Sequence, residues 1–120
     1  MEKLSKNFSR EEFACKDQCG FDTVDVGLLD LIQRVRDHYG KPVIIHCACR
    51  CLAHNAALGR EDTSQHTKAR AIDFHIESIP HEDIYIWIDN GVLKGKCGLG
   101  IYPWGVHIDN RTDGPARWRG

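Results

Sequence analysis

The segment Ala71–Ile76 constrains the fold most, because large apolar residues alternate in it with small or polar ones. Successive side chains of a strand point to opposite faces of a sheet, so Asp73 and His75 are predicted to share one face with Ala71. The opposite face then carries three large apolar side chains, those of Ile72, Phe74 and Ile76. A sheet built on this strand needs a cover on one face only, and its second face can carry a functional site.

Three further segments have the composition of strands. The run Val43–His46 is short and β-branched, and Leu99–Tyr102 and Val106–Asp109 flank a proline- and glycine-containing turn at 103–105. Connections of hairpin length join antiparallel strands, whereas parallel strands need long crossovers. We therefore predict an antiparallel sheet.

The clearest helix is predicted from an N-cap at Asp25 to Tyr39, where Gly40 suits the helix end and Pro42 cannot continue it. Its apolar face is formed by Leu28, Leu29, Ile32 and Val35. Shorter helices are predicted after Ser9, over Leu52–Leu58 and from Ile79 to Gly91, with a loop over Arg60–Lys68. The predicted fold class is α+β: a small antiparallel sheet with helices packed on one face, in a single domain over residues 1–120.

Composition excludes several classes of partner. The 16 basic and 17 acidic residues leave a net charge of −1, so a nucleic-acid surface is not expected. No apolar run approaches the about 20 residues of a membrane span, and the first residues lack the apolar core of a secretory signal. We expect a monomer that is cytoplasmic when made, with no membrane partner.

Histidine and aspartate recur in two places that the sheet can bring together. His66 precedes Asp73 by seven residues in a polar stretch, and His107 and Asp109 share a face of the last strand. Two imidazoles and one carboxylate suit Zn²⁺ and leave a fourth position for water. Antiparallel pairing of the two strands would bring Asp73 and His107 within bonding reach. From the residues alone, a surface loop and an ordinary strand pair remain the alternative.

These segments resemble a known family. Ser64-Gln65-His66 followed by Ala71-x-Asp73 resembles the first motif of zinc D-alanyl-D-alanine carboxypeptidases and related phage endolysins, whose fold is shared with the hedgehog signalling domain. The stretch 98–109, with Val106-His107-Ile108-Asp109, resembles their second motif, and Arg50 to Asn55 and the ending Ala116-Arg117-Trp118 resemble the short single-domain branch. The resemblance implies a hedgehog-type fold and Zn²⁺ held by His66, Asp73 and His107, in a peptidase that acts on peptidoglycan stem peptides.

Other roles follow for residues near these ligands. Arg50 is the candidate for stabilising the oxyanion or gripping a substrate carboxylate, and Gln65 with Ser64 for binding substrate beside the metal. Family members carry the general base two or three residues before the last ligand, where this chain has Trp104 and Gly105. Asp109 is therefore the candidate base; its alternative is to orient a ligand or to pair with an arginine such as Arg111.

Two other functions stay open. The fold would also suit a zinc-bearing module that binds the cell wall without catalysis. Six cysteines, including Cys15, Cys19 and a group at positions 47, 49 and 51, could instead indicate a redox or structural metal protein. As a peptidase, the chain could be a carboxypeptidase or an endopeptidase, and it would reach the wall after release, as a phage or prophage enzyme does.

Overall fold

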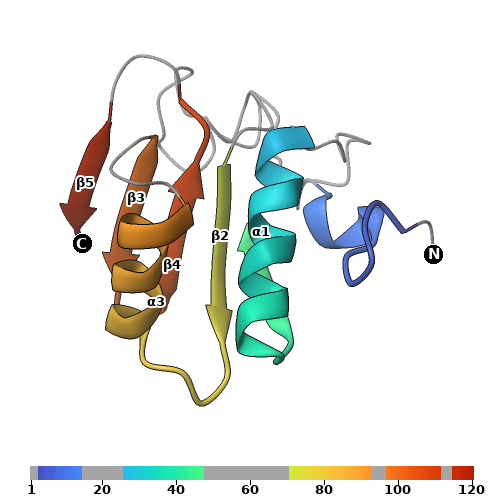
Figure 1. The fold of residues 1–120 in the computed structure, drawn as a ribbon, viewed down its shortest axis with the longest axis horizontal. Helices are drawn as coiled ribbons and strands as arrows, with labels where there is room; N and C mark the ends of the chain where they lie inside the picture. The colour runs from blue at the N-terminus through green and yellow to red at the C-terminus, as the bar shows by residue number, and fades with distance from the viewer. Residues whose placement is uncertain (1–2, 15–25, 48–70, 93–96, 112–114) are drawn as a thin grey trace.

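The computed structural model describes residues 3–14, 26–47, 71–92, 97–111 and 115–120 (Figure 1). The helices are the 3₁₀-helix η1 (Arg10–Phe13), the α-helices α1 (Val26–Tyr39) and α3 (His81–Trp87), and the π-helical turn η3 (Ile88–Val92). The strands are β1 (Val43–Cys47), β2 (Ala71–Ile76), β3 (Gly98–Tyr102), β4 (Gly105–Asp109) and β5 (Ala116–Arg119). The α+β prediction is confirmed for these residues.

The strands form one sheet in the order β1-β2-β4-β3-β5. The first three neighbouring pairs are antiparallel, but β5 runs parallel to β3, so the prediction of a purely antiparallel sheet is wrong at this edge. The register explains the exception. Gly98 pairs with Asp109 on one side and with Ala116 on the other, so β4 ends at the end of the sheet where β3 and β5 both begin. A strand added beyond β3 from that end must follow the direction of β3.

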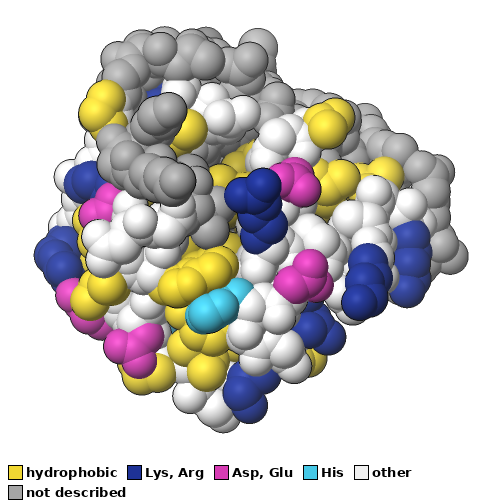
Figure 2. Space-filling model, in the orientation of Figure 1, with side chains coloured by type: hydrophobic (Ala, Val, Ile, Leu, Met, Phe, Trp, Pro, Cys, Tyr) yellow, Lys and Arg dark blue, Asp and Glu magenta, His cyan; other side chains and the backbone are white. Residues whose placement is uncertain are grey.

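Helices α1 and α3 lie side by side over the same face of the sheet (Figure 1). Helix α1 turns Leu28, Ile32 and Val35 inward, and all three are fully buried. On the sheet side, the alternation of β2 appears as predicted, because Ile72, Phe74 and Ile76 are buried in the same core. Figure 2 shows the helix-bearing face, on which acidic and basic side chains are interspersed rather than gathered by sign.

The predicted helix ends are partly confirmed. Gly40 follows α1 with a φ of +62°, a left-handed conformation that glycine adopts without strain. At η1, the Glu12 carboxylate accepts a 2.7 Å hydrogen bond from the Ser9 backbone N–H, as a capping box requires. Helix α3 is shorter than predicted and passes into η3. The predicted Leu52–Leu58 helix and the loop after it lie outside the described residues, and no described helix is both long and apolar enough to cross a bilayer.

Candidate metal centre

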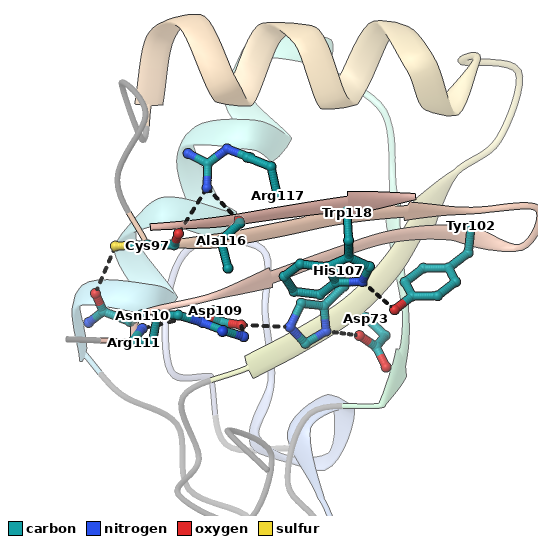
Figure 3. Close-up of polar contacts among 10 residues, drawn as sticks. All are labelled: Asp73, Cys97, Tyr102, His107, Asp109, Asn110, Arg111, Ala116, Arg117 and Trp118. Atoms are coloured by element: carbon teal, nitrogen blue, oxygen red, sulfur yellow. Dashed lines mark hydrogen bonds and ion pairs between the residues drawn. The ribbon is translucent and has the colours of Figure 1, made fainter. Parts of the chain in front are cut away.

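Asp73 and His107 meet on the sheet face opposite the helices (Figure 3). They are direct partners in the β2–β4 register, so the predicted antiparallel pairing of these strands is confirmed. His107 Nδ1 lies 2.6 Å from Asp73 Oδ1, and the two side chains are only 12% and 16% exposed. Paired strands hold the backbones of both residues, so this contact depends on regular structure and not on a loop.

Asp109 lies on the other side of the His107 ring. His107 Nε2 is 2.9 Å from Asp109 Oδ2, and the Asp109 side chain is fully buried. Arg111 donates to both oxygens of this carboxylate, from Nε to Oδ1 at 2.8 Å and from Nη2 to Oδ2 at 2.7 Å. The Arg111 backbone N–H donates a third bond, of 3.2 Å, to Oδ1. Each carboxylate oxygen of Asp109 therefore has at least two donors.

Gly98 makes room for this carboxylate. A Cβ atom at Gly98 would lie 2.2 Å from Asp109 Oδ1, closer than any non-bonded contact allows. Because Gly98 pairs with Asp109 across β3 and β4, a larger residue would push Asp109 away from Arg111 and His107. Gly98 therefore belongs to the structure that supports the candidate metal centre.

The charges around Asp109 keep it ionised. Burial raises the pKa of the Asp109 carboxyl, but hydrogen bonds from Arg111 and His107 and their charges outweigh it, so that pKa lies well below its ordinary value. An ionised carboxylate only accepts hydrogen bonds. His107 must therefore carry a proton on Nε2, and in the neutral ring this leaves the Nδ1 lone pair facing Asp73.

The donor set fits a divalent cation as far as the described residues extend. The 2.6 Å between His107 Nδ1 and Asp73 Oδ1 is a hydrogen-bond distance, so the two atoms share a proton here. As ligands of one Zn²⁺, each about 2.0–2.2 Å from the metal, they would give up this proton and move apart. A neutral imidazole and a carboxylate are ligands that Zn²⁺ takes in proteins, but two of them do not complete a site. The described residues contain no group of three or more metal-ligating side chains placed to hold an ion. His66, the predicted third ligand, lies outside the described residues, as do Ser64, Gln65 and Arg50.

The sequence analysis missed a set of aromatic rings beside this centre. The Trp118 ring centroid on β5 lies 5.1 Å from that of His107, and the Trp118 Nε1–H donates to the Tyr102 hydroxyl at 2.5 Å (Figure 3). Trp104 stacks on Tyr102 with centroids 4.7 Å apart. Only the resemblance of the ending Ala116-Arg117-Trp118 pointed to Trp118, because no strand was predicted over these residues.

The sheet face opposite α1 and α3, on which Asp73 and His107 lie, is here called the metal-facing side. His75 lies on this side of β2, as predicted, but its ring contacts His46 on β1 and not the centre. Its Nδ1 is 2.6 Å from His46 Nε2, and its Nε2 is 3.0 Å from Glu77 Oε1. A bulge in β1 between Ile45 and Cys47 shifts the register at His46. The histidine pair therefore flanks the candidate metal centre.

Comparisons with known proteins agree with this geometry. The family model of peptidase M15 matches residues 6–109, a stretch that includes all three predicted ligands. The peptidoglycan L,D-endopeptidase MepK of Escherichia coli strain K12 is 36% identical over an alignment of 105 residues, which covers 79% of this chain and 54% of that protein. MepK of Shigella flexneri matches to the same extent. The chain thus spans about half the length of these curated relatives.

M15 peptidases are generally zinc-dependent, which agrees with a centre built on an imidazole and a carboxylate. The family match covers most of the chain and both histidine–aspartate motifs. On this match, together with the curated relatives, the chain belongs to the peptidase M15 family.

Proposed function

We propose that this chain is a zinc peptidase that hydrolyses amide bonds in peptidoglycan stem peptides. The observation that carries the proposal is that His107 and Asp73 meet, 2.6 Å apart, on the sheet face opposite α1 and α3, in a member of a peptidase family. The relatives are named for L,D-endopeptidase activity, which makes an L,D bond the first to test. The bond that holds a terminal D-alanine is the second bond to test.

The metal would be held by Asp73 and His107 together with His66. When bound, zinc lowers the pKa of a coordinated water and polarises a carbonyl, which is the chemistry that amide hydrolysis needs. The side chains of Asp73 and His107 are more than four-fifths buried, at 16% and 12% exposed. Burial favours the metal because a cation and a carboxylate attract each other more strongly away from bulk water.

For Asp109 we propose the orienting role, one of the two that the sequence left open. A general base must take a proton, but the pKa of Asp109 is held low and both its oxygens are occupied by donors. The same contacts suit it to hold His107 with Nε2 protonated and Nδ1 directed at Asp73. Arg111 in turn fixes the carboxylate.

The resemblance to the family supplies the remaining roles. Arg50 would stabilise the oxyanion or bind a substrate carboxylate, and Gln65 and Ser64 would bind substrate next to His66. We propose that the chain acts as a monomer on wall peptides once it reaches them. These proposals do not depend on the zinc ligands and are tested separately. Arg50→Lys tests the role of Arg50, and size-exclusion chromatography tests the monomer.

Digestion of purified sacculi tests the function directly. The zinc-loaded chain should release fragments whose masses, read by mass spectrometry, identify the bond cut. His66→Ala, Asp73→Ala and His107→Ala should each abolish release and lower the zinc content. His81→Ala is the matched control, because His81 lies on α3 across the sheet and contacts the Tyr102 backbone oxygen.

Three outcomes separate the alternatives. Loss of terminal D-alanine alone would make the chain a carboxypeptidase, which corrects the bond but not the class. Full activity after chelation of the metal would reject the zinc mechanism. Stoichiometric zinc and wall binding without any cleavage would instead indicate the non-catalytic wall-binding module.

A further inference from the structure

We infer that Trp118, Tyr102 and Trp104, here called the aromatic row, extend the substrate site away from the candidate metal centre. The inference rests on the proposed function, because Trp118, the first member of the row, lies next to the predicted zinc ligand His107. Trp118 pairs with Gly100 on β3, and Gly100 pairs with His107 on β4, so all three positions share the metal-facing side of the sheet. Tyr102 lies two residues farther along β3 on the same face.

The rings are held together by their own contacts. A Cβ atom at Gly100 would lie 2.4 Å from the Trp118 ring, so glycine lets the indole lie flat against β3. The Trp118 N–H is used within the row, by the Tyr102 hydroxyl, and the Tyr102 and Trp104 planes are 9° from parallel. A surface that is already ordered loses little conformational freedom when it binds a ligand.

The chemistry of the row selects an uncharged part of the substrate. None of its three side chains carries a charge, and the nearby Arg111 is engaged with Asp109. Trp104 is 40% exposed, so part of its ring is accessible to a ligand. Aromatic faces bind C–H groups, which a wall fragment offers in two places: the methyl groups of its alanines and the ring face of its sugar.

The length of the row indicates how far from the scissile bond the substrate contacts it. Tyr102 pairs with Gly105, two residues along β4 from His107, which corresponds to about 7 Å of strand. An extended peptide covers that distance with two or three residues at about 3.3–3.6 Å each. The row therefore contacts a part of the substrate two or three residues from the scissile bond, and binding there favours long substrates over short ones.

Binding to the row has a readout other than hydrolysis. The chain has three tryptophans, Trp87, Trp104 and Trp118, and the indole N–H groups give separate NMR signals. Trp87 stacks on His38 at 4.0 Å on the helix side and serves as the internal control. The zinc-loaded protein is titrated with a stem tetrapeptide and with the disaccharide-tetrapeptide. The signals of Trp104 and Trp118 should shift while that of Trp87 stays, and a larger shift with the disaccharide form would assign the contact to the sugar.

Kinetics give the second test. Trp104→Ala should raise KM for the disaccharide-tetrapeptide about 2- to 10-fold, the loss of one aromatic contact, with kcat unchanged. Trp104→Phe should restore most of the affinity. A dipeptide that spans only the scissile bond should be cut equally by the wild type and both variants.

The outcomes distinguish the row from the peptidase. Cleavage by the wild type with unmoved Trp104 and Trp118 signals, and an unchanged KM in Trp104→Ala, overturns the row and leaves the peptidase intact. Shifted signals without any cleavage support the row and reject the peptidase. Should Trp104→Ala fail to fold, the wild-type titration decides alone.

Discussion

At the scale of single residues, the centre depends on one imidazole held from both sides by carboxylates. Asp73 faces Nδ1 of His107 and Asp109 faces its Nε2, at 2.6 and 2.9 Å. The two carboxylates are not equivalent. Arg111 neutralises the charge of Asp109 and fixes its oxygens. Asp73 instead lies where it could bind the same metal ion as His107. This difference in environment is the basis on which we propose an orienting role for Asp109 and a ligating role for Asp73.

Replacing Asp109 tests this division of roles. In Asp109→Asn the amide can offer its NH₂ group to His107, which no longer requires the proton on Nε2. We expect zinc affinity to fall about 10- to 100-fold, as for other partners of metal-bound histidines, and hydrolysis to fall with it. Competition with a chromogenic chelator measures the affinity.

Asp89→Asn is the matched control, because Asp89 also pairs with an arginine, Arg117, at 2.8 Å, but on the helix side of the sheet. It should leave zinc affinity unchanged. If Asp109→Asn keeps its zinc affinity and loses only kcat, Asp109 is the general base and the orienting role is wrong.

At the scale of elements, glycines on β3 decide how closely the side chains of neighbouring strands approach it. Gly98 admits the Asp109 carboxylate and Gly100 admits the Trp118 ring. Both glycines fall on the metal-facing side of the strand, and the intervening Leu99 is buried in the core. One face of β3 is thus shaped for the site and the other for stability.

Gly100→Ala should destabilise the fold by about 1–3 kcal/mol, because the added methyl group overlaps the Trp118 ring. Chemical denaturation measures the change. Gly91→Ala is the control, since a Cβ atom there has nothing within 4 Å, and its stability should stay the same or rise slightly. Equal stability of the two variants would mean that the Trp118 ring moves aside freely.

Strand β5 is tied to α3 by an exposed ion pair. Arg119 donates to both oxygens of Glu82 at 2.7 Å, and these hydrogen bonds hold the pKa of the Glu82 carboxyl below its ordinary value. A lowered pKa in the folded state stabilises the fold above the unfolded-state pKa, and this contribution is lost as the pH falls through the folded-state value.

The unfolding temperature of Glu82→Gln should therefore lie slightly below that of the wild type at neutral pH and equal it in acid. High salt should also shrink the difference, because the pair is exposed and screened. Glu11→Gln, on η1, controls for the loss of one charge. A difference that persists in acid would show that the glutamine disturbs packing and not the ion pair.

Most of the sheet could be predicted from the sequence. The two features that were not predicted, strand β5 and the bulge in β1, have physical causes. Alternation in Ala71–Ile76 and the turn at 103–105 predicted three strands and their pairing, because local patterns decide these features. Strand β5 was missed because arginine occupies its alternate positions, where Arg117 and Arg119 pair with acidic partners across the fold. The β1 bulge has no local signal at His46 and depends on pairing with β2.

At the scale of the whole molecule, one face of the sheet packs in the hydrophobic core and the other carries the candidate site. Helices α1 and α3 cover the apolar face, and the metal-facing side carries Asp73, His107 and the aromatic row. The pairing of Asp73 with His107 could be predicted because residue type and alternation limit where these side chains lie. The closeness of Trp118 to His107 could not be predicted, since it depends on a parallel strand pair that joins segments with no common pattern.

Because the predicted ligands come from distant segments, metal should bind the folded chain and not the unfolded one. Bound zinc then stabilises the fold by RT ln(1 + [Zn]/Kd), about 2.7 kcal/mol at a hundredfold excess over Kd. Removing zinc with a chelator should lower the unfolding temperature and abolish hydrolysis, and added zinc should restore both. Calorimetry and the sacculus digest measure the two effects on one preparation.

His66→Ala provides the decisive comparison for this prediction. It removes one of the three predicted ligands, seven residues before Asp73 and far along the chain from His107, so its unfolding temperature should respond little to zinc. If the variant responds as the wild type does, the metal is held elsewhere, for example by cysteines. A loss of the response in His66→Ala, with the response kept in His81→Ala, would link the two halves of the sequence through a single ion on the sheet face opposite α1 and α3.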